Sequence, residues 1–386
     1  MKIRSLRFQT ILFAAIRTVF NTLYRMVYPF LSVFSRGLGV DISALSQALA
    51  NRSLIGALGP FLAAIADRRG RKIGMLFGIG LFTVGIGVII LWPSFPAFVI
   101  MLVLTSLGKY GFDPSMQAYL GDRIPYRRRG RILAITELGW SLSFIIGIPL
   151  MSLLIASRGW WSPFVVLALM GALVGGLLIW LLPNDSCPKE DNQSKLWRNF
   201  WDVLRYPPAL AGLAVGLTAS TANEAINLVF GVWMEDAFAL KIIALGGTAA
   251  VIGFAELGGE TLVGAFVDRL GKVRAVTIGL LLNCLVALSF PLLGRHAAGA
   301  VIGLFLFYIS FEFALVSIIP MMTEIMPEAR ATLMAFNVAA LSLGRALGAL
   351  IAPPLYHWGI AACAGATVIF NLVAIFVMRW VREEDS

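Results

Sequence analysis

Long apolar runs separated by short polar stretches fill almost the whole chain. Each run holds the roughly 20 residues that an α-helix needs to cross the hydrocarbon core of a bilayer. Glycine, proline and charged residues mark where the runs begin and end. The pattern predicts an all-α integral membrane protein with twelve transmembrane helices, at about 9–34, 42–66, 72–92, 96–120, 131–156, 161–182, 208–234, 243–267, 274–294, 297–323, 331–355 and 359–380.

The pattern occurs twice. The stretch Ala63 to Met75 (AAIADRRGRKIGM) has a counterpart in Gly264 to Val276 (GAFVDRLGKVRAV), and Pro125 to Leu150 resembles Pro327 to Leu355 at the same spacing along the chain. Two unrelated stretches that share one spacing indicate an internal repeat. We therefore expect two pseudo-symmetric six-helix bundles joined by a cytoplasmic linker, with the divisions 1–182, 183–207 and 208–386.

Composition supports this class. Hydrophobic residues make up 59% of the chain, charged residues 13%, and the mean hydropathy is +0.85, whereas ordinary soluble domains are about 45–50% apolar and about 25% charged. The net charge of +10 does not indicate nucleic acid, because the bases lie in bands between apolar runs. The composition leaves no room for a sizeable soluble domain.

The bands of lysine and arginine predict the topology. Most of these bases lie at the termini and in the connections 67–72, 123–131, 183–207 and 269–274. By the positive-inside rule, these connections and both termini are cytoplasmic, in a multi-pass protein of the cell (inner) membrane. The opposite side carries only Arg36, Arg158, Lys241 and Arg295.

The linker contains one amphipathic stretch. Five apolar residues fall on one face of a predicted helix, which suits a helix lying at the membrane interface. A flexible connection is the alternative, and it fits the polar first part of the linker better. The apolar face consists of Leu196, Trp197, Phe200, Trp201 and Leu204.

Charges inside the predicted spans are the candidate functional groups, because an ionisable side chain at the bilayer centre costs about 2.5–3.5 kcal/mol on insertion scales. The first, fourth, seventh and tenth spans each carry a polar stripe at helical spacing with a charge near its middle. The four stripes are Arg17, Asn21, Tyr24 and Tyr28, with Arg25 beside them; Lys109, Asp113 and Gln117; Ser220, Glu224 and Asn227; and Tyr308 with Glu312.

Static ion pairs that fix helix packing are the alternative for these groups. Lys109 and Asp113, one turn apart, suit such a pair. Arg17 has no acidic neighbour within its own span, which favours a role in substrate binding or gating. Tyr24 and Tyr28 could instead be anchors at the membrane interface.

Glu256 and Glu260, in the eighth span, are like charges one turn apart, and this disfavours ionisation of both at once. A carboxyl group that is protonated in one state and ionised in another is what proton coupling requires. The alternative is neutralisation by Arg345 or Arg52. Glu137 in the fifth span is a weaker candidate of the same kind.

No constellation of an enzyme is visible. The chain lacks HExxH and a Walker-type GxxxxGK[ST] sequence, which disfavours a metalloprotease and direct use of ATP. Cys187, Cys284 and Cys363 are an odd number without CxxC spacing, so no disulfide framework or metal site is indicated. We expect no cofactor, no metal and no nucleic-acid partner, and a monomer.

The doubled stretch carries the pattern G/A-x-x-x-D-R-x-G-R/K between spans two and three and again between spans eight and nine. With twelve spans in two halves, it resembles the major facilitator superfamily of secondary transporters. The resemblance implies two bundles that rock about a central site lined by spans one, four, seven and ten. The residues of this gating motif are Asp67, Arg68, Gly70 and Arg71, and then Asp268, Arg269 and Gly271.

Two further expectations come from this resemblance. Asp67 and Asp268 would each latch onto the start of a helix in the other half, near Ala331 and Arg131 respectively. The run GWSLSFIIGIPL resembles the fifth-span motif of antiporters, although Ile148 separates the second glycine from the proline. The matching positions are Gly139, Gly147 and Pro149.

Together these features predict a proton-coupled secondary transporter that exports small, partly apolar compounds, with Asp113, Glu224 and Glu312 as coupling or cation-facing carboxylates. One alternative is uptake of a small organic anion, with Arg17, Arg25 and Lys109 as counter-charges. Another is a membrane assembly factor or sensor that keeps the fold without transporting.

Overall fold

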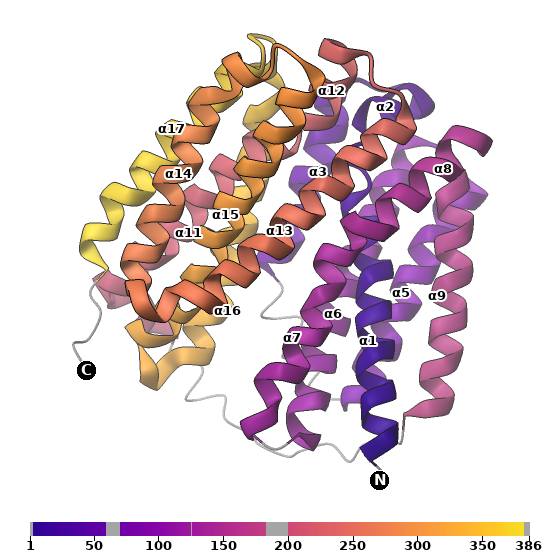
Figure 1. Ribbon diagram of the computed structural model, residues 1–386. Helices are drawn as coiled ribbons and strands as arrows, with labels where there is room; N and C mark the ends of the chain where they lie inside the picture. Colours follow the sequence, from indigo (N-terminus) through magenta and orange to yellow (C-terminus); the bar gives the residue numbers. More distant parts are fainter. Residues whose placement is uncertain (1–2, 59–69, 125, 183–199, 382–386) are drawn as a thin grey trace. The chain divides into compact units, whose positions relative to one another are not determined.

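The computed structural model describes residues 3–58, 70–124, 126–182 and 200–381, and these form helices joined by short turns (Figure 1). The all-α prediction is confirmed. The elements are α1 (Ile3–Arg25), α2 (Leu31–Leu38), α3 (Ile42–Ala57), α5 (Arg71–Leu91), α6 (Phe95–Arg123), α7 (Tyr126–Leu142), the π-helix η1 (Ser143–Gly147), α8 (Ile148–Arg158), α9 (Ser162–Leu181), α11 (Pro207–Asn227), α12 (Phe230–Phe238), α13 (Ile242–Leu270), α14 (Lys272–Leu293), α15 (Ala297–Ile325), the 3₁₀ turn η2 (Pro327–Ala329), α16 (Arg330–Tyr356), α17 (Ile360–Val377) and the 3₁₀ turn η3 (Met378–Trp380).

In the described part of the chain, nine helical segments are long and apolar enough to cross a membrane. They correspond to the third to sixth and eighth to twelfth predicted spans. The first and seventh predicted spans, which carry polar stripes, are not among the nine. The second predicted span continues beyond residue 58, outside the described residues. The total of twelve spans therefore stays a prediction.

The first and seventh spans differ from their prediction as single helices. Residues 26–30 form a turn between α1 and α2, and the turn contains Pro29, which has no backbone N–H to continue a helix. At the corresponding place in the second half, α11 ends at Asn227 and α12 begins at Phe230. The interruption is thus part of the repeat.

Backbone geometry repeats together with the sequence. Among the described residues, positive φ angles occur at equivalent turns of the two halves, where a side chain is strained and glycine is favoured. The three pairs are Gly39 (67°) with Ala239 (51°), Gly70 (97°) with Gly271 (82°), and Gly159 (90°) with Gly359 (87°).

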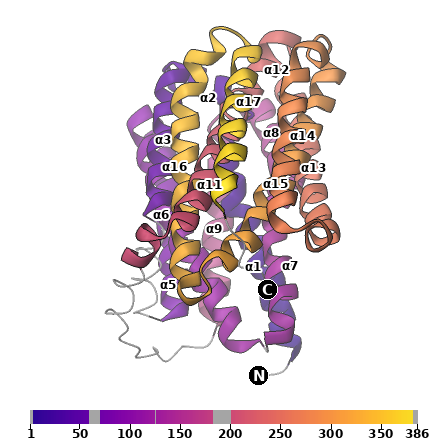
Figure 2. The same cartoon turned by 90° about the vertical axis from the view of Figure 1, so that its left-hand side faces the viewer.

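The contacts divide the chain into two compact units. Unit 1 contains α1, α2, α5 to α9 and the part of α13 up to Gly253, and unit 2 contains α3, α11, α12, the rest of α13 and α14 to α17. Contacts define these units rather than chain order, so the predicted divisions at residues 182 and 208 stay predictions. In unit 2, α11 packs against both α16 and α17 (Figure 2).

Within unit 1, α5 and α6 approach closely through paired glycines. A Cβ atom built on Gly78 would lie 2.5 Å from the carbonyl oxygen of Gly108, and one built on Gly108 would lie 2.5 Å from the carbonyl oxygen of Gly78. Small residues permit such approach between membrane helices. Gly80, also on α5, has nothing within 4 Å of its Cβ position.

We expect Gly78→Ala to lower the stability of the detergent-solubilised protein by about 1–3 kcal/mol, because a backbone carbonyl cannot move aside for the methyl group. Gly80→Ala, in the same helix, is the matched control and should unfold at the wild-type temperature or slightly above it. Thermal unfolding of both variants tests this, and equal transitions would contradict the close helix contact.

The described end of the linker, residues 200–205, is helical. The ring of Phe200 lies 5.1 Å from that of Phe336 in α16, and Val203 is buried in the core of unit 2. Trp201 is exposed. Leu196 and Trp197, the first members of the predicted apolar face, lie outside the described residues.

Candidate functional site

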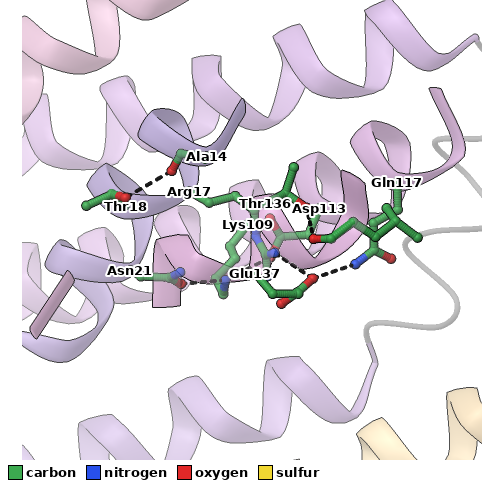
Figure 3. A network of polar contacts seen from close by, with 10 residues as sticks. Ala14, Arg17, Thr18, Asn21, Lys109, Asp113, Gln117, Thr136 and Glu137 are labelled. Carbon is green, nitrogen blue, oxygen red and sulfur yellow. Dashed lines mark hydrogen bonds and ion pairs between the residues drawn. The ribbon is translucent and has the colours of Figure 1, made fainter. Parts of the chain in front are cut away.

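A cluster of charged side chains joins three helices of unit 1 (Figure 3). Arg17 of α1 lies with its Nε 3.3 Å from Oδ1 of Asp113 and its Nη1 2.6 Å from Oε1 of Glu137 in α7. The Nζ of Lys109 lies 2.8 Å from Oδ2 of Asp113, one turn away on α6. We call these four residues the Arg17 network.

Two polar side chains extend the network. Lys109 donates a hydrogen bond of 2.7 Å to Oδ1 of Asn21, and Gln117 donates one of 3.3 Å to Oε1 of Glu137. The predicted stripe of the first span thus meets that of the fourth. The expected pair of Lys109 and Asp113 is present, but Asp113 also holds Arg17, which a sequence spacing cannot indicate.

Close packing places Glu137 beside Arg17. A Cβ on Gly139, half a turn from Glu137, would lie 2.9 Å from both the carbonyl oxygen of Ala14 and the Cβ of Arg17. The absence of a side chain on Gly139 therefore lets α7 approach α1 closely at this level. Sequence reasoning placed Gly139 in a fifth-span motif and gave Glu137 little weight.

The Arg17 network contains two bases and two acids, so its ionised form is neutral. The side chains of Arg17 and Lys109 are 7% and 11% exposed, that of Asp113 is 18% exposed, and that of Glu137 is 45% exposed. Buried ions are tolerated when they are paired in this way. Glu137 is the most exposed member of the network.

Arg25 lies outside this network, although it shares α1 with Arg17. Its guanidinium carbon is 3.4 Å from the ring centre of Phe144 and 4.3 Å from that of Trp140, and it donates a 3.2 Å hydrogen bond to the carbonyl of Trp140. These are cation–π contacts. Tyr24, with its ring 6.4 Å from Trp140, and Tyr28 are both buried.

The fifth-span motif coincides with a change in helix type. The segment from Ser143 to Gly147 is π-helical and ends two residues before Pro149, which cannot donate a backbone hydrogen bond. Gly147 packs on the side chain of Thr22 in α1. A side chain at Gly147 would collide with Thr22.

Unit 2 contains a second polar chain between α11 and α15. The hydroxyl of Tyr308 donates a 2.7 Å hydrogen bond to Oδ1 of Asn227, and the amide of Asn227 donates a 3.0 Å bond to Oε2 of Glu224. Glu224 is 1% exposed. Glu312, one turn along α15 from Tyr308, is also buried, with its Cβ 2.7 Å from a Cβ built on Gly259 of α13.

The carboxyl groups of the eighth span and their candidate counter-charges all belong to unit 2. Glu256 and Arg52 are buried at 3% and 1% exposure, whereas Glu260 and Arg345 are half-buried. Each of the four has interaction partners. The choice between proton coupling and static neutralisation stays open for these residues.

The gating motif is only partly described. Asp67 and Arg68 lie outside the described residues, and Asp268 and Arg269 are exposed at the end of α13. The bases after the two turns form equivalent ion pairs: Arg71 with Asp122 of α6, at 3.4 Å, and Lys272 with Glu324 of α15. The predicted latches stay predictions.

Sequence reasoning missed one buried network in unit 2. The amide of Asn283 in α14 donates to the carbonyl of Phe307 at 2.8 Å and to the hydroxyl of Ser310 at 3.1 Å, and Asn371 of α17 donates to Asn283 at 2.8 Å. Both asparagines are fully buried. An asparagine within an apolar run was the available signal, and the network ties three helices together.

Helices of spanning length with paired charges between them define a multi-pass membrane protein with polar groups inside each unit. Residues 13–323 match the family described as the Major Facilitator Superfamily. The chain belongs to that family, and it is a secondary transporter rather than an enzyme.

The relatives agree with this assignment. The chain is 23% identical to the uncharacterized MFS-type transporter YwfA of Bacillus subtilis (strain 168), covering 92% of this chain and 88% of that one. It is 25% identical to the inner membrane transport protein YdhP of Escherichia coli (strain K12), covering 83% and 81%.

Solved structures show the same fold. A bacterial homologue of the human lysosomal transporter Spinster, in an inward-facing and unoccupied conformation, superposes with a TM-score of 0.77 at 14% identity, covering 99% of this chain and 95% of that one. The identity is low, so this likeness concerns the fold alone.

Proposed function

We propose that the chain couples the movement of a small organic compound to protons, and that the Arg17 network is a coupling site. The observation that carries this proposal is the ion pair between Glu137, which is partly exposed, and Arg17, which is largely buried. Through Arg17, Glu137 is linked to Asp113 and Lys109, which are also largely buried inside spans. Intramembrane ionisable groups of this kind mark substrate and proton pathways in transporters.

Two candidates differ in the direction of coupling. Export in exchange for protons is supported by the fifth-span residues Gly139 and Gly147, both packed closely on α1. Uptake of an organic anion together with protons is supported by Arg17 and Lys109, two bases held near the middle of the spans. The Tyr308–Asn227–Glu224 chain is compatible with either candidate, as a second place for a proton.

Transport by the purified protein in liposomes tests the proposal. Inward and outward pH gradients are imposed, and fluxes of labelled organic acids, amines and neutral aromatic compounds are measured. We expect flux of at least one class to follow the gradient and to reverse with it. Flux that no gradient alters, in either direction and for every class, would contradict proton coupling.

A further inference from the structure

We propose that Glu137 is a displaceable counter-ion of Arg17, so that protonation of Glu137 opens a site for the carboxylate of a small organic acid. This inference rests on the proposed function and specifies its substrate class. An acid and a proton would then bind to the protein together and be transported in the same direction.

The two carboxylates of the Arg17 network are held unequally. Asp113 uses one oxygen for Arg17 and the other for Lys109, and it is 18% exposed. In Glu137, the same oxygen, Oε1, contacts Arg17 and accepts the hydrogen bond from Gln117, and the side chain is 45% exposed. Glu137 is therefore the more exposed of the two acids and the one that can leave Arg17 with the smaller loss of contacts.

Charge balance makes protonation and anion binding depend on each other. When Glu137 is neutral, Arg17 and Lys109 share the single negative charge of Asp113, and one positive charge inside the spans is uncompensated. An uncompensated charge in this environment is costly. A carboxylate that takes the place of Glu137 on Arg17 restores neutrality, and guanidinium groups suit carboxylates well.

The elements that pack against α7 include α1, α6 and η1. Their charged groups near Glu137 are Arg17, Asp113 and Lys109, and Gln117 is the neutral partner. Arg25, two turns further along α1, is stacked on Phe144 and Trp140.

The same geometry disfavours an amine as the ligand of this site. A cation bound to Glu137 would share this carboxylate with Arg17, whose Nη1 lies 2.6 Å from Oε1. The ionised network is already neutral, so this added cation would leave one positive charge uncompensated inside the spans. The network therefore favours an organic acid as the ligand, and the acid and a proton move in the same direction.

The test measures binding to the detergent-solubilised full chain between pH 5.5 and 8. The probes are acetate, benzoate and nicotinate, with acetamide, benzamide and nicotinamide as uncharged counterparts of the same shape. For the wild type we expect an acid to bind while its amide does not, with one proton taken up per acid. On the alkaline side, the apparent Kd then rises about tenfold per pH unit.

Variants of Glu137 decide the role of this carboxylate. Glu137→Gln should bind the same acid with an affinity that does not change over this pH range, because it mimics the protonated state permanently. Glu137→Asp should keep the pH dependence. Glu328→Gln, which changes an exposed acid of η2, is the control and should behave as the wild type.

Failure of this inference is distinct from failure of proton coupling. A wild-type pH dependence in Glu137→Gln, acid binding without proton uptake, or no binding of any acid probe would overturn the role of Glu137. Each of these results leaves gradient-driven flux in liposomes intact. Loss of that flux, with proton-linked acid binding retained, would instead overturn the proposed function.

Discussion

Asp113→Asn is expected to abolish gradient-driven transport and to destabilise the protein by about 3–5 kcal/mol, the cost typical of removing one partner from a buried ion pair. Among the described residues, Asp113 is the only carboxylate in contact with both bases of the Arg17 network. Its neutralisation leaves Lys109 without an ionised partner among the described contacts of the network and leaves Arg17 with Glu137 alone.

A second substitution makes this expectation specific. In the double variant Asp113→Asn with Lys109→Gln, Arg17 and Glu137 still balance each other, so we expect most of the stability to return while transport stays impaired. Asp122→Asn, on the same helix but 53% exposed, is the control and should change the free energy of unfolding by no more than about 0.5 kcal/mol.

Thermal unfolding in detergent and flux in liposomes check both expectations. A double variant that is as unstable as the single one would show that charge balance does not stabilise the network. The interaction energy from the complete cycle measures how strongly Lys109 and Asp113 are coupled.

The sequence predicts the repeat and the helices well, because each depends on local pattern. Apolar runs and the repeated glycines specify where helices begin and end, and the positive φ angles at Gly70 and Gly271 occur at the predicted turns. The break between α1 and α2 was not predicted. The apolar run continues through it, and only Pro29 marks it in the sequence.

Contacts between helices could not be predicted in the same way. The pair of Lys109 and Asp113 follows from spacing on one helix, since residues four apart share a face. The partners of Arg17 do not follow from spacing, because Glu137 contacts Arg17 through the close approach of α7 to α1 at Gly139. A single sequence gives the face on which a residue lies, but not the helix that packs against that face.

Glu224→Gln is expected to have the largest effect in unit 2. Glu224 is buried at 1% exposure, its Cβ lies 2.5 Å from a Cβ built on Gly348, and Asn227 donates to its Oε2. Glutamine has the same shape, and Asn227 can present its oxygen instead of its amide after a flip of the side chain. The variant should therefore fold normally.

If Glu224 carries a proton during transport, glutamine removes that step without removing the site. Accumulation driven by a pH gradient should fall by about tenfold or more, within the range of typical coupling free energies, whereas exchange of labelled for unlabelled substrate continues. Tyr308→Phe removes the hydrogen bond to Asn227, worth about 1 kcal/mol, and should slow accumulation to a smaller extent. Accumulation at the wild-type rate in Glu224→Gln would assign Glu224 to helix packing, and loss of exchange together with accumulation would assign it to substrate binding rather than to the proton.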